Sequence, residues 1–209
     1  DIEMLLESAS DDATRIFLNG IAWVENELVS TNVFILTIVG DQVTNANGTS
    51  IMPKDSMKEL VNLCKKFKMV QVKIQVNDSF FKVDNEHFTL MGRLIAEEYP
   101  KYQSVIPKTT SKEMNIVEPV KFKDIKDILN KRSFKVNLES KNGQAFLVVE
   151  GTEFKKQVGT NEFNSDIGFN LKYLEFLTNL DGKLKFNNEL SPFMVAKGNI
   201  TRIAMPMKI

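Results

Sequence analysis

The segment PKDSMKELVNLCKKF, residues 53–67, defines the repeating unit of the fold. Its apolar side chains recur at helical spacing, which predicts one amphipathic helix with an apolar stripe facing a core, and Pro53 suits the helix entry. The stripe consists of Met57, Leu60, Val61, Cys64 and Phe67. Polar residues, most of them lysines, occupy the opposite face of this predicted helix.

The same plan recurs along the chain. Apolar spacing predicts further helices over 121–132 and 170–180, and residues 1–10 resemble the remnant of a fourth. Runs of β-branched and aromatic residues predict strands over 15–25, 28–39, 69–77, 79–85 and 87–97. A unit of one helix and a few strands needs neighbouring units to cover its sheet. The pattern therefore favours a duplicated α+β fold with helices on one face of antiparallel sheets. An unrelated α+β domain with chance spacing is the alternative.

Charge divides the chain into two parts. Residues 1–107 hold 10 Lys and Arg against 15 Asp and Glu, whereas residues 108–209 hold 17 against 12. The polar segment 105–114 has the composition of a linker. We therefore predict two domains, 1–107 and 108–209, each of a common domain size.

Several classes of function lack their sequence signals. The single cysteine, Cys64, allows no disulfide within the chain, which favours a cytoplasmic protein, and no apolar run reaches the roughly 20 residues of a membrane-spanning helix. The single histidine, His87, has no second His or Cys with which to form a metal site, and we expect it on a solvated turn. Nucleotide-binding glycine motifs and nucleophile elbows are missing from the sequence. We predict a protein that is not an enzyme and needs no cofactor.

Three basic helix faces are candidates for contact with DNA. A solvated face would explain any one of them, but together they could contact phosphates without reading bases. The acidic residues of segment 1–12 do not fit a DNA-facing helix. The predicted DNA-facing residues are Lys54, Lys58, Lys65, Lys66, Lys123, Lys126, Lys131, Arg132 and Lys172.

Four motifs occur in the order of one known family. They are RIFLNGIAW (15–23), LMGRLIAEEYPKYQSVIP (90–107), IGFNLKYLEFLTNL (167–180) and IAMPMKI (203–209). Together they resemble the bacterial sliding clamp, the DNA polymerase III beta subunit, in its middle and last domains only. Domain 1–107 resembles the middle clamp domain without its N-terminal strand, and domain 108–209 resembles the C-terminal one.

The resemblance implies a processivity factor for DNA replication, a non-catalytic subunit of the DNA polymerase holoenzyme. Such a ring encircles double-stranded DNA irrespective of sequence, with helices lining the hole, and tethers the replicative polymerase. A dimer of three-domain subunits, a trimer of two-domain subunits and a monomer that never closes all stay open, as does a trimmed or partial chain. The alternative is a clamp-derived accessory protein or fragment that binds replication peptides without encircling DNA.

The resemblance also implies a pocket for peptides of DNA polymerase and the clamp loader. Flexible methionines in an apolar cleft suit several short peptides. Where the family usually has a basic turn, this chain has the apolar run 32–39, and Ser104 replaces a frequent arginine, so peptide preference is open. The alternative for the tail is an ordinary closing strand. The expected pocket residues are Leu18, Val33, Ile35, Thr37, Pro100, Ser104, Val105, Ile203, Ala204, Met205, Pro206 and Met207.

Overall fold

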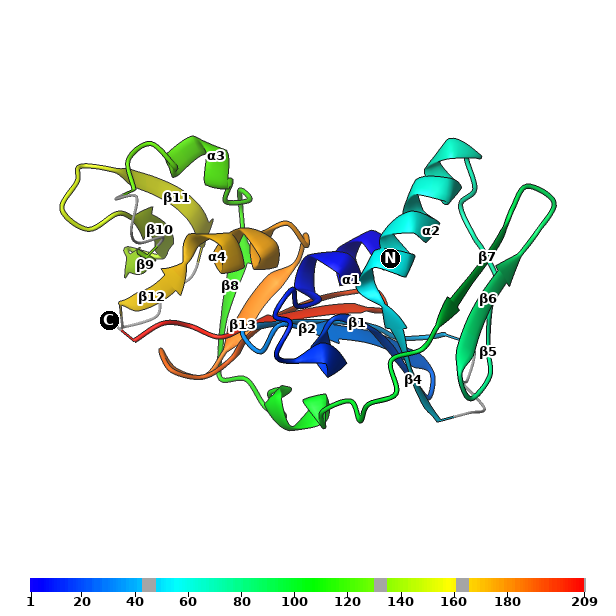
Figure 1. Ribbon diagram of the computed structural model, residues 1–209. Coiled ribbons are helices and arrows are strands. Elements are labelled where there is room, and N and C mark those ends of the chain that lie inside the picture. The colour runs from blue at the N-terminus through cyan, green and yellow to red at the C-terminus, as the bar shows by residue number, and fades with distance from the viewer. Residues whose placement is uncertain (43–47, 130–134, 161–165, 209) are drawn as a thin grey trace. The chain divides into compact units, whose positions relative to one another are not determined.

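The computed structural model describes residues 1–42, 48–129, 135–160 and 166–208 (Figure 1). The chain forms two compact units, Asp1–Lys101 and Tyr102–Ile209. Both are built from short helices and antiparallel strands.

Unit 1 contains two helices and seven strands among its described residues. Its main sheet has the antiparallel order β3-β2-β1-β4, and a second sheet has the order β5-β6-β7. The elements are α1 (Ile2–Ser8), η1 (Ile16–Leu18), β1 (Gly20–Val24), β2 (Glu27–Thr31), β3 (Ile35–Val39), β4 (Thr49–Pro53), α2 (Lys54–Lys66), β5 (Ile74–Val76), β6 (Phe80–Asp84) and β7 (Thr89–Arg93).

Unit 2 repeats the design with eight described strands in the antiparallel order β12-β9-β10-β11-β8-β13-β14-β15. Its elements are η2 (Tyr102–Val105), β8 (Lys112–Ile116), α3 (Phe122–Ile125), β9 (Lys135–Lys141), β10 (Gln144–Val148), β11 (Lys155–Thr160), β12 (Ile167–Asn170), α4 (Leu171–Thr178), β13 (Lys183–Phe186), β14 (Phe193–Lys197) and β15 (Ile200–Ala204).

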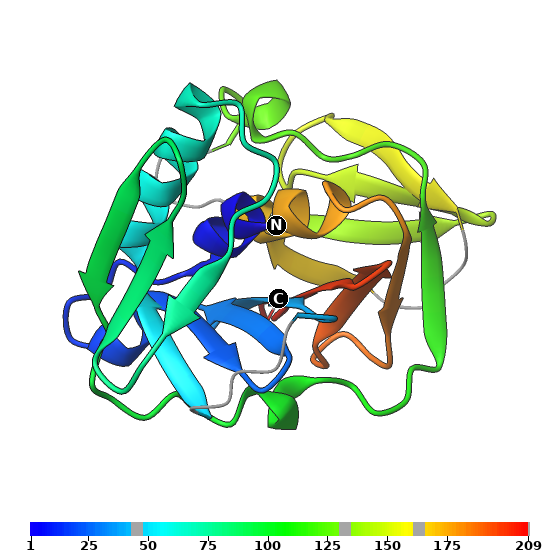
Figure 2. The same cartoon turned by 90° about the vertical axis from the view of Figure 1, so that its right-hand side faces the viewer.

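Among the described residues, a helix followed by three antiparallel strands occurs four times, which confirms the predicted duplicated α+β fold. Strands β4, β8 and β12 each precede a helix in the chain. Each of them pairs with the first strand that follows the other helix of its unit. Thus β4 pairs with β1, β8 with β13 and β12 with β9. Figure 2 shows β12 leading directly into α4.

Helices α2 and α4 agree with the predicted helical segments, but the predicted helix over 121–132 is wrong in its extent. Regular helix α3 ends at Ile125, residues 126–128 form a turn and residue 129 a bend, while residues 130–132 lie outside the described part. Ile125 and Leu129 are nevertheless buried. The spacing of apolar residues indicates which side chains face the core. In this segment one turn of α-helix followed by a non-helical turn places those side chains in the core.

The predicted strand over 28–39 is two strands with a turn between them. The side-chain oxygen of Asn32 accepts hydrogen bonds from the amides of Phe34 and Ile35, each at 3.0 Å, and so closes the hairpin between β2 and β3. Val33, at the tip, has a φ of 82°. The predicted strand over 15–25 likewise begins as the short helix η1, and that over 69–77 is regular only at β5.

The core of unit 2 contains a cluster of three buried aromatic rings. Phe193 stacks on Phe186 with ring centroids 4.3 Å apart and meets the edge of Phe169 at 4.8 Å. All three side chains are fully buried. They join β12, β13 and β14, and thereby support the sheet under α4.

Candidate nucleic-acid and peptide interfaces

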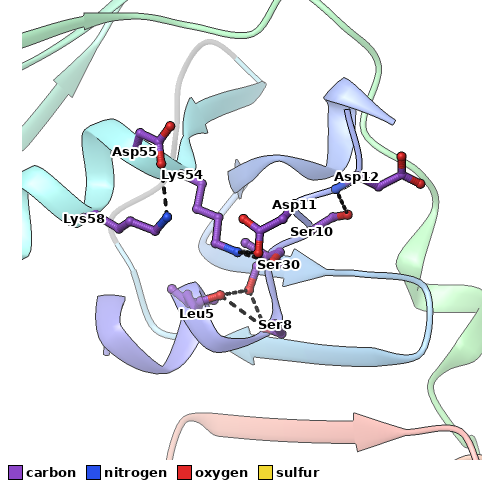
Figure 3. Close-up of polar contacts among 10 residues, drawn as sticks. Leu5, Ser8, Ser10, Asp11, Asp12, Ser30, Lys54, Asp55 and Lys58 are labelled. Carbon is purple, nitrogen blue, oxygen red and sulfur yellow. Dashed lines mark hydrogen bonds and ion pairs between the residues drawn. The ribbon is translucent and has the colours of Figure 1, made fainter. Parts of the chain in front are cut away.

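Helix α1 is held on the main sheet of unit 1 by a buried polar cluster (Figure 3). The Ser30 hydroxyl on β2 donates to the carbonyl of Leu5 at 2.7 Å. The Ser8 hydroxyl lies 2.6 Å from that of Ser30 and donates to the Thr37 hydroxyl on β3 at 2.8 Å. Buried polar groups left without partners are costly, so this network fixes where α1 lies on β2 and β3.

Lys54, the first residue of α2, is tied to the segment after α1. Its Nζ donates to the carbonyl of Ala9 at 2.7 Å and lies 2.8 Å from the Asp11 carboxylate, and only 11% of its side chain is exposed (Figure 3). The hydrogen bond from Lys54 lowers the pKa of Asp11. A phosphate contact by Lys54, as predicted from the sequence, would have to break both bonds. Its placement is that of a structural lysine.

Lys58 and Lys65 lie on the surface of α2, and each has a carboxylate partner. Lys58 is 3.1 Å from Asp55 one turn earlier, and Lys65 pairs with Glu3 of α1. Side-chain exposure is 50% for Lys58 and 66% for Lys65, so both ammonium groups are in contact with solvent. The hydrogen bond from Lys65 lowers the pKa of Glu3. Glu3 and Asp11 belong to the acidic segment 1–12, which did not fit a DNA-facing helix. In the structure their carboxylates are the partners of Lys65 and Lys54 of α2.

The last residues of α2 form a mixed basic and aromatic surface. Lys66 is exposed, and its Nζ lies 5.4 Å from the ring centroid of Phe67. Phe67 also stacks on His87 in the β6–β7 turn, with ring centroids 5.1 Å apart. Within the described residues, Lys66 makes no ion pair.

In unit 2, side chains of α4 hold the start of α3. The Glu175 carboxylate accepts from the amide of Phe122 at 3.0 Å, and the Thr178 hydroxyl accepts from the amide of Val120 at 3.0 Å. Both bonds satisfy amides that precede or begin a helix and so lack helical partners. Sequence patterns gave no sign of this pairing, because donor and acceptor lie more than fifty residues apart.

The predicted DNA-facing residues of unit 2 have different surroundings. Lys123 and Lys126 are exposed and have no carboxylate within ion-pair distance among the residues described. Lys172 lies over the Phe122 ring, 5.5 Å from its centroid. Lys131 and Arg132 lie outside the described residues.

The predicted peptide-pocket residues of unit 1 divide into buried and exposed groups. Leu18 and Ile35 are core residues, and Thr37 takes part in the buried polar cluster under α1. Val33 is half exposed and Pro100 is exposed. Sequence reasoning missed Phe34, whose side chain is 53% exposed beside Val33 at the hairpin tip. The signal that could have found it is Asn32, a turn residue within an apolar run.

Those of unit 2 lie in η2 and in the tail. Ser104 and Val105 are exposed, whereas Ile203 and Ala204 are buried in β15. Met205 and Pro206 are half-buried. The amide of Met207 donates to the carbonyl of Gly168 at 2.8 Å, which holds the tail against β12, and its side chain stays 38% exposed.

The described residues include one cysteine and no cluster of metal-binding side chains. Cys64 is half-buried on α2, and burial raises the pKa of its thiol, which disfavours the nucleophilic thiolate. Across the described ranges no three His, Cys, Asp or Glu side chains gather into a possible metal site. No helix in those ranges is long and apolar enough to cross a membrane.

Comparison with known proteins identifies relatives in sequence. No protein-family model matches the chain. The beta sliding clamp of Rickettsia felis is 26% identical over 202 residues, which are 83% of this chain and 53% of that protein. This chain therefore spans about half the length of the curated relative it matches.

Solved structures of clamps share the fold. The DNA polymerase III beta subunit of Bartonella birtlesii, bound to griselimycin, superposes with a TM-score of 0.85 at 22% identity, over 100% of this chain and 64% of that one. The Helicobacter pylori beta clamp, bound to a DNA ligase peptide, gives 0.82 at 19% identity, over 99% and 62%. The predicted resemblance to bacterial sliding clamps is confirmed, and the fold is that of a beta clamp.

Proposed function

We propose that this chain, which resembles bacterial beta sliding clamps in sequence and has their fold, acts as a DNA sliding clamp. In this proposal it is a non-catalytic processivity factor that encircles duplex DNA as part of an oligomeric ring and tethers a polymerase. The observation that carries the proposal is the superposition of the whole chain on clamp structures. Exposed lysines on α2 and beside α3 support it, because loosely held phosphate contacts suit a protein that must slide.

The DNA contact is tested with Lys123→Glu/Lys126→Glu. The two exposed lysines, which have no ion-pair partners among the described residues, become carboxylates. Duplex affinity at about 50 mM salt should therefore fall at least tenfold. The slope of log K against log salt should become shallower by the contribution of about two phosphate contacts. The measurement is fluorescence anisotropy of a labelled duplex across a salt series. The matched control is Lys108→Glu/Lys141→Glu, which changes charge equally at exposed positions of unit 2 outside its helices. Equal losses in the two variants would contradict the proposed contact.

Encirclement is tested separately, by topology. With a clamp loader present, we expect retention on nicked circular DNA and loss from linear DNA, because a ring slides off free ends. Equal retention on both would rule out encirclement.

The second candidate is an accessory protein that binds replication peptides without encircling DNA. The ion pairs of Lys58 and Lys65 favour it, because they reduce the basic character of α2. Two separate surfaces are candidates for peptide contact: Val33 and Phe34 in unit 1, and Met205, Pro206 and Met207 in unit 2.

Subunit mass distinguishes the two candidates, and peptide binding tests a property that both of them require. A labelled clamp-binding peptide should give saturable anisotropy with either one, and Met207→Glu should weaken that binding at least fivefold because it places a charge on a contact surface that is largely apolar. Light scattering on the intact chain should give a closed oligomer for the clamp and a monomer for the accessory protein. A closed oligomer with no saturable peptide signal would rule out the accessory role.

A further inference from the structure

We propose that Glu3 of α1 is an intramolecular competitor of DNA phosphate for Lys65 of α2, and so weakens duplex binding by unit 1 and reduces its salt dependence. The inference rests on the proposed DNA contact. It assigns to a carboxylate of the same surface the role of weakening that contact. It starts from the ion pair that joins the two helices across 62 positions of sequence.

The pair has the properties of a reversible contact. The side chains of Lys65 and Glu3 are 66% and 59% exposed, and exposed ion pairs contribute little to stability because solvent screens them. A phosphate can therefore replace the carboxylate at small cost. Glu3 lowers the affinity of Lys65 for phosphate without abolishing it.

Asp11 provides the contrast within the same segment. Only 11% of the side chain of its partner Lys54 is exposed, and Lys54 is also bound to the carbonyl of Ala9. The pair therefore cannot open without loosening the connection between α1 and α2. Asp11 thus stabilises the helix pair, whereas Glu3 can exchange its partner. The buried cluster of Ser8, Ser30 and Thr37 keeps α1 in place while it does so.

The effect on salt dependence follows from counterion release. A lysine that neutralises a phosphate releases cations condensed on the DNA, and each such contact adds about −0.9 to the slope of log K against log salt. While Lys65 is paired with Glu3 it neutralises no phosphate and releases no cation from the DNA. Competition by Glu3 therefore reduces the average number of phosphates neutralised, which keeps the binding weak and less sensitive to ionic strength.

The test is duplex binding by the intact chain across a salt series. Glu3→Gln should raise affinity about two- to five-fold at low salt and steepen the slope by up to about 0.9. The matched control, Glu98→Gln, removes the same charge from an exposed position of unit 1 outside the helices and should have a smaller effect. Adding Lys65→Gln to Glu3→Gln should abolish the gain, because the freed lysine is then lost.

The outcomes separate this inference from the proposed function. Equal effects of Glu3→Gln and Glu98→Gln, or a gain that survives Lys65→Gln, would overturn the competition while leaving the DNA contact intact. If Lys123→Glu/Lys126→Glu leaves duplex binding unchanged, the proposed contact in unit 2 fails whatever Glu3 does. If none of the variants binds duplex DNA, both the inference and the proposed function are overturned.

Discussion

Phe193→Ala is expected to lower the free energy of unfolding of unit 2 by about 3–5 kcal/mol. The ring is fully buried, stacks on Phe186 and contacts the edge of Phe169. Its removal loses the transfer free energy of the ring and leaves a cavity, because the two neighbouring rings belong to paired strands that cannot collapse into the space. Urea denaturation monitored by circular dichroism measures the change.

The control for this substitution is Leu190→Ala. Leu190 is also a large apolar residue of unit 2, but 61% of its surface is exposed, so its truncation should change the unfolding free energy by less than about 0.5 kcal/mol. A loss below about 1 kcal/mol for Phe193→Ala would mean that the three rings do not form the tightly packed core described above.

Arg202→Ala should destabilise unit 2 by about 2–3 kcal/mol. The guanidinium of Arg202, on β15, is nearly inaccessible to solvent; it donates to the carbonyl of Phe176 at 2.7 Å and lies 4.5 Å from the centroid of the Phe176 ring. A hydrogen bond to a charged group is worth about 1.5–3 kcal/mol and a desolvated cation–π contact about 2. Removing a buried charge recovers part of its desolvation cost, so the net loss is smaller than this sum.

The loss should be concentrated at the C-terminal end of α4, where the carbonyl of Phe176 gains a cationic partner that also suits the helix dipole. Hydrogen exchange of the α4 amides should therefore accelerate in Arg202→Ala. Lys197→Met on the neighbouring strand removes an exposed ion pair with Asp181, which solvent screens, and should cost much less than Arg202→Ala. Equal destabilisation by the two substitutions would contradict the structural role of Arg202.

Hydrophobic periodicity predicted the elements that bury one continuous face. Met57 and Leu60 of α2, like Leu171 and Leu174 of α4, are spaced along one side of a helix and are fully buried, so their pattern and their structure agree. The four-fold recurrence of one helix and its strands was visible for the same reason. Where the pattern misled, at α3, Ile125 and Leu129 are buried at helical spacing, but regular helical hydrogen bonding ends at Ile125.

Long-range polar contacts escaped prediction because sequence spacing carries no information about them. Lys54 and Lys65 both lie on the polar face of α2, yet one is enclosed by Ala9 and Asp11 and the other faces solvent beside Glu3. The difference arises from where α1 lies on the sheet. That position depends on the Ser8, Ser30 and Thr37 hydroxyls, which have no distinctive pattern in the sequence.

The exchange of strands within unit 2 has a consequence for how the unit unfolds. Because β8 pairs with β13 while β12 pairs with β9, each half of the unit completes the sheet of the other. Neither half can lose its strands without exposing an unpaired edge in the other half. The two halves are therefore expected to unfold together.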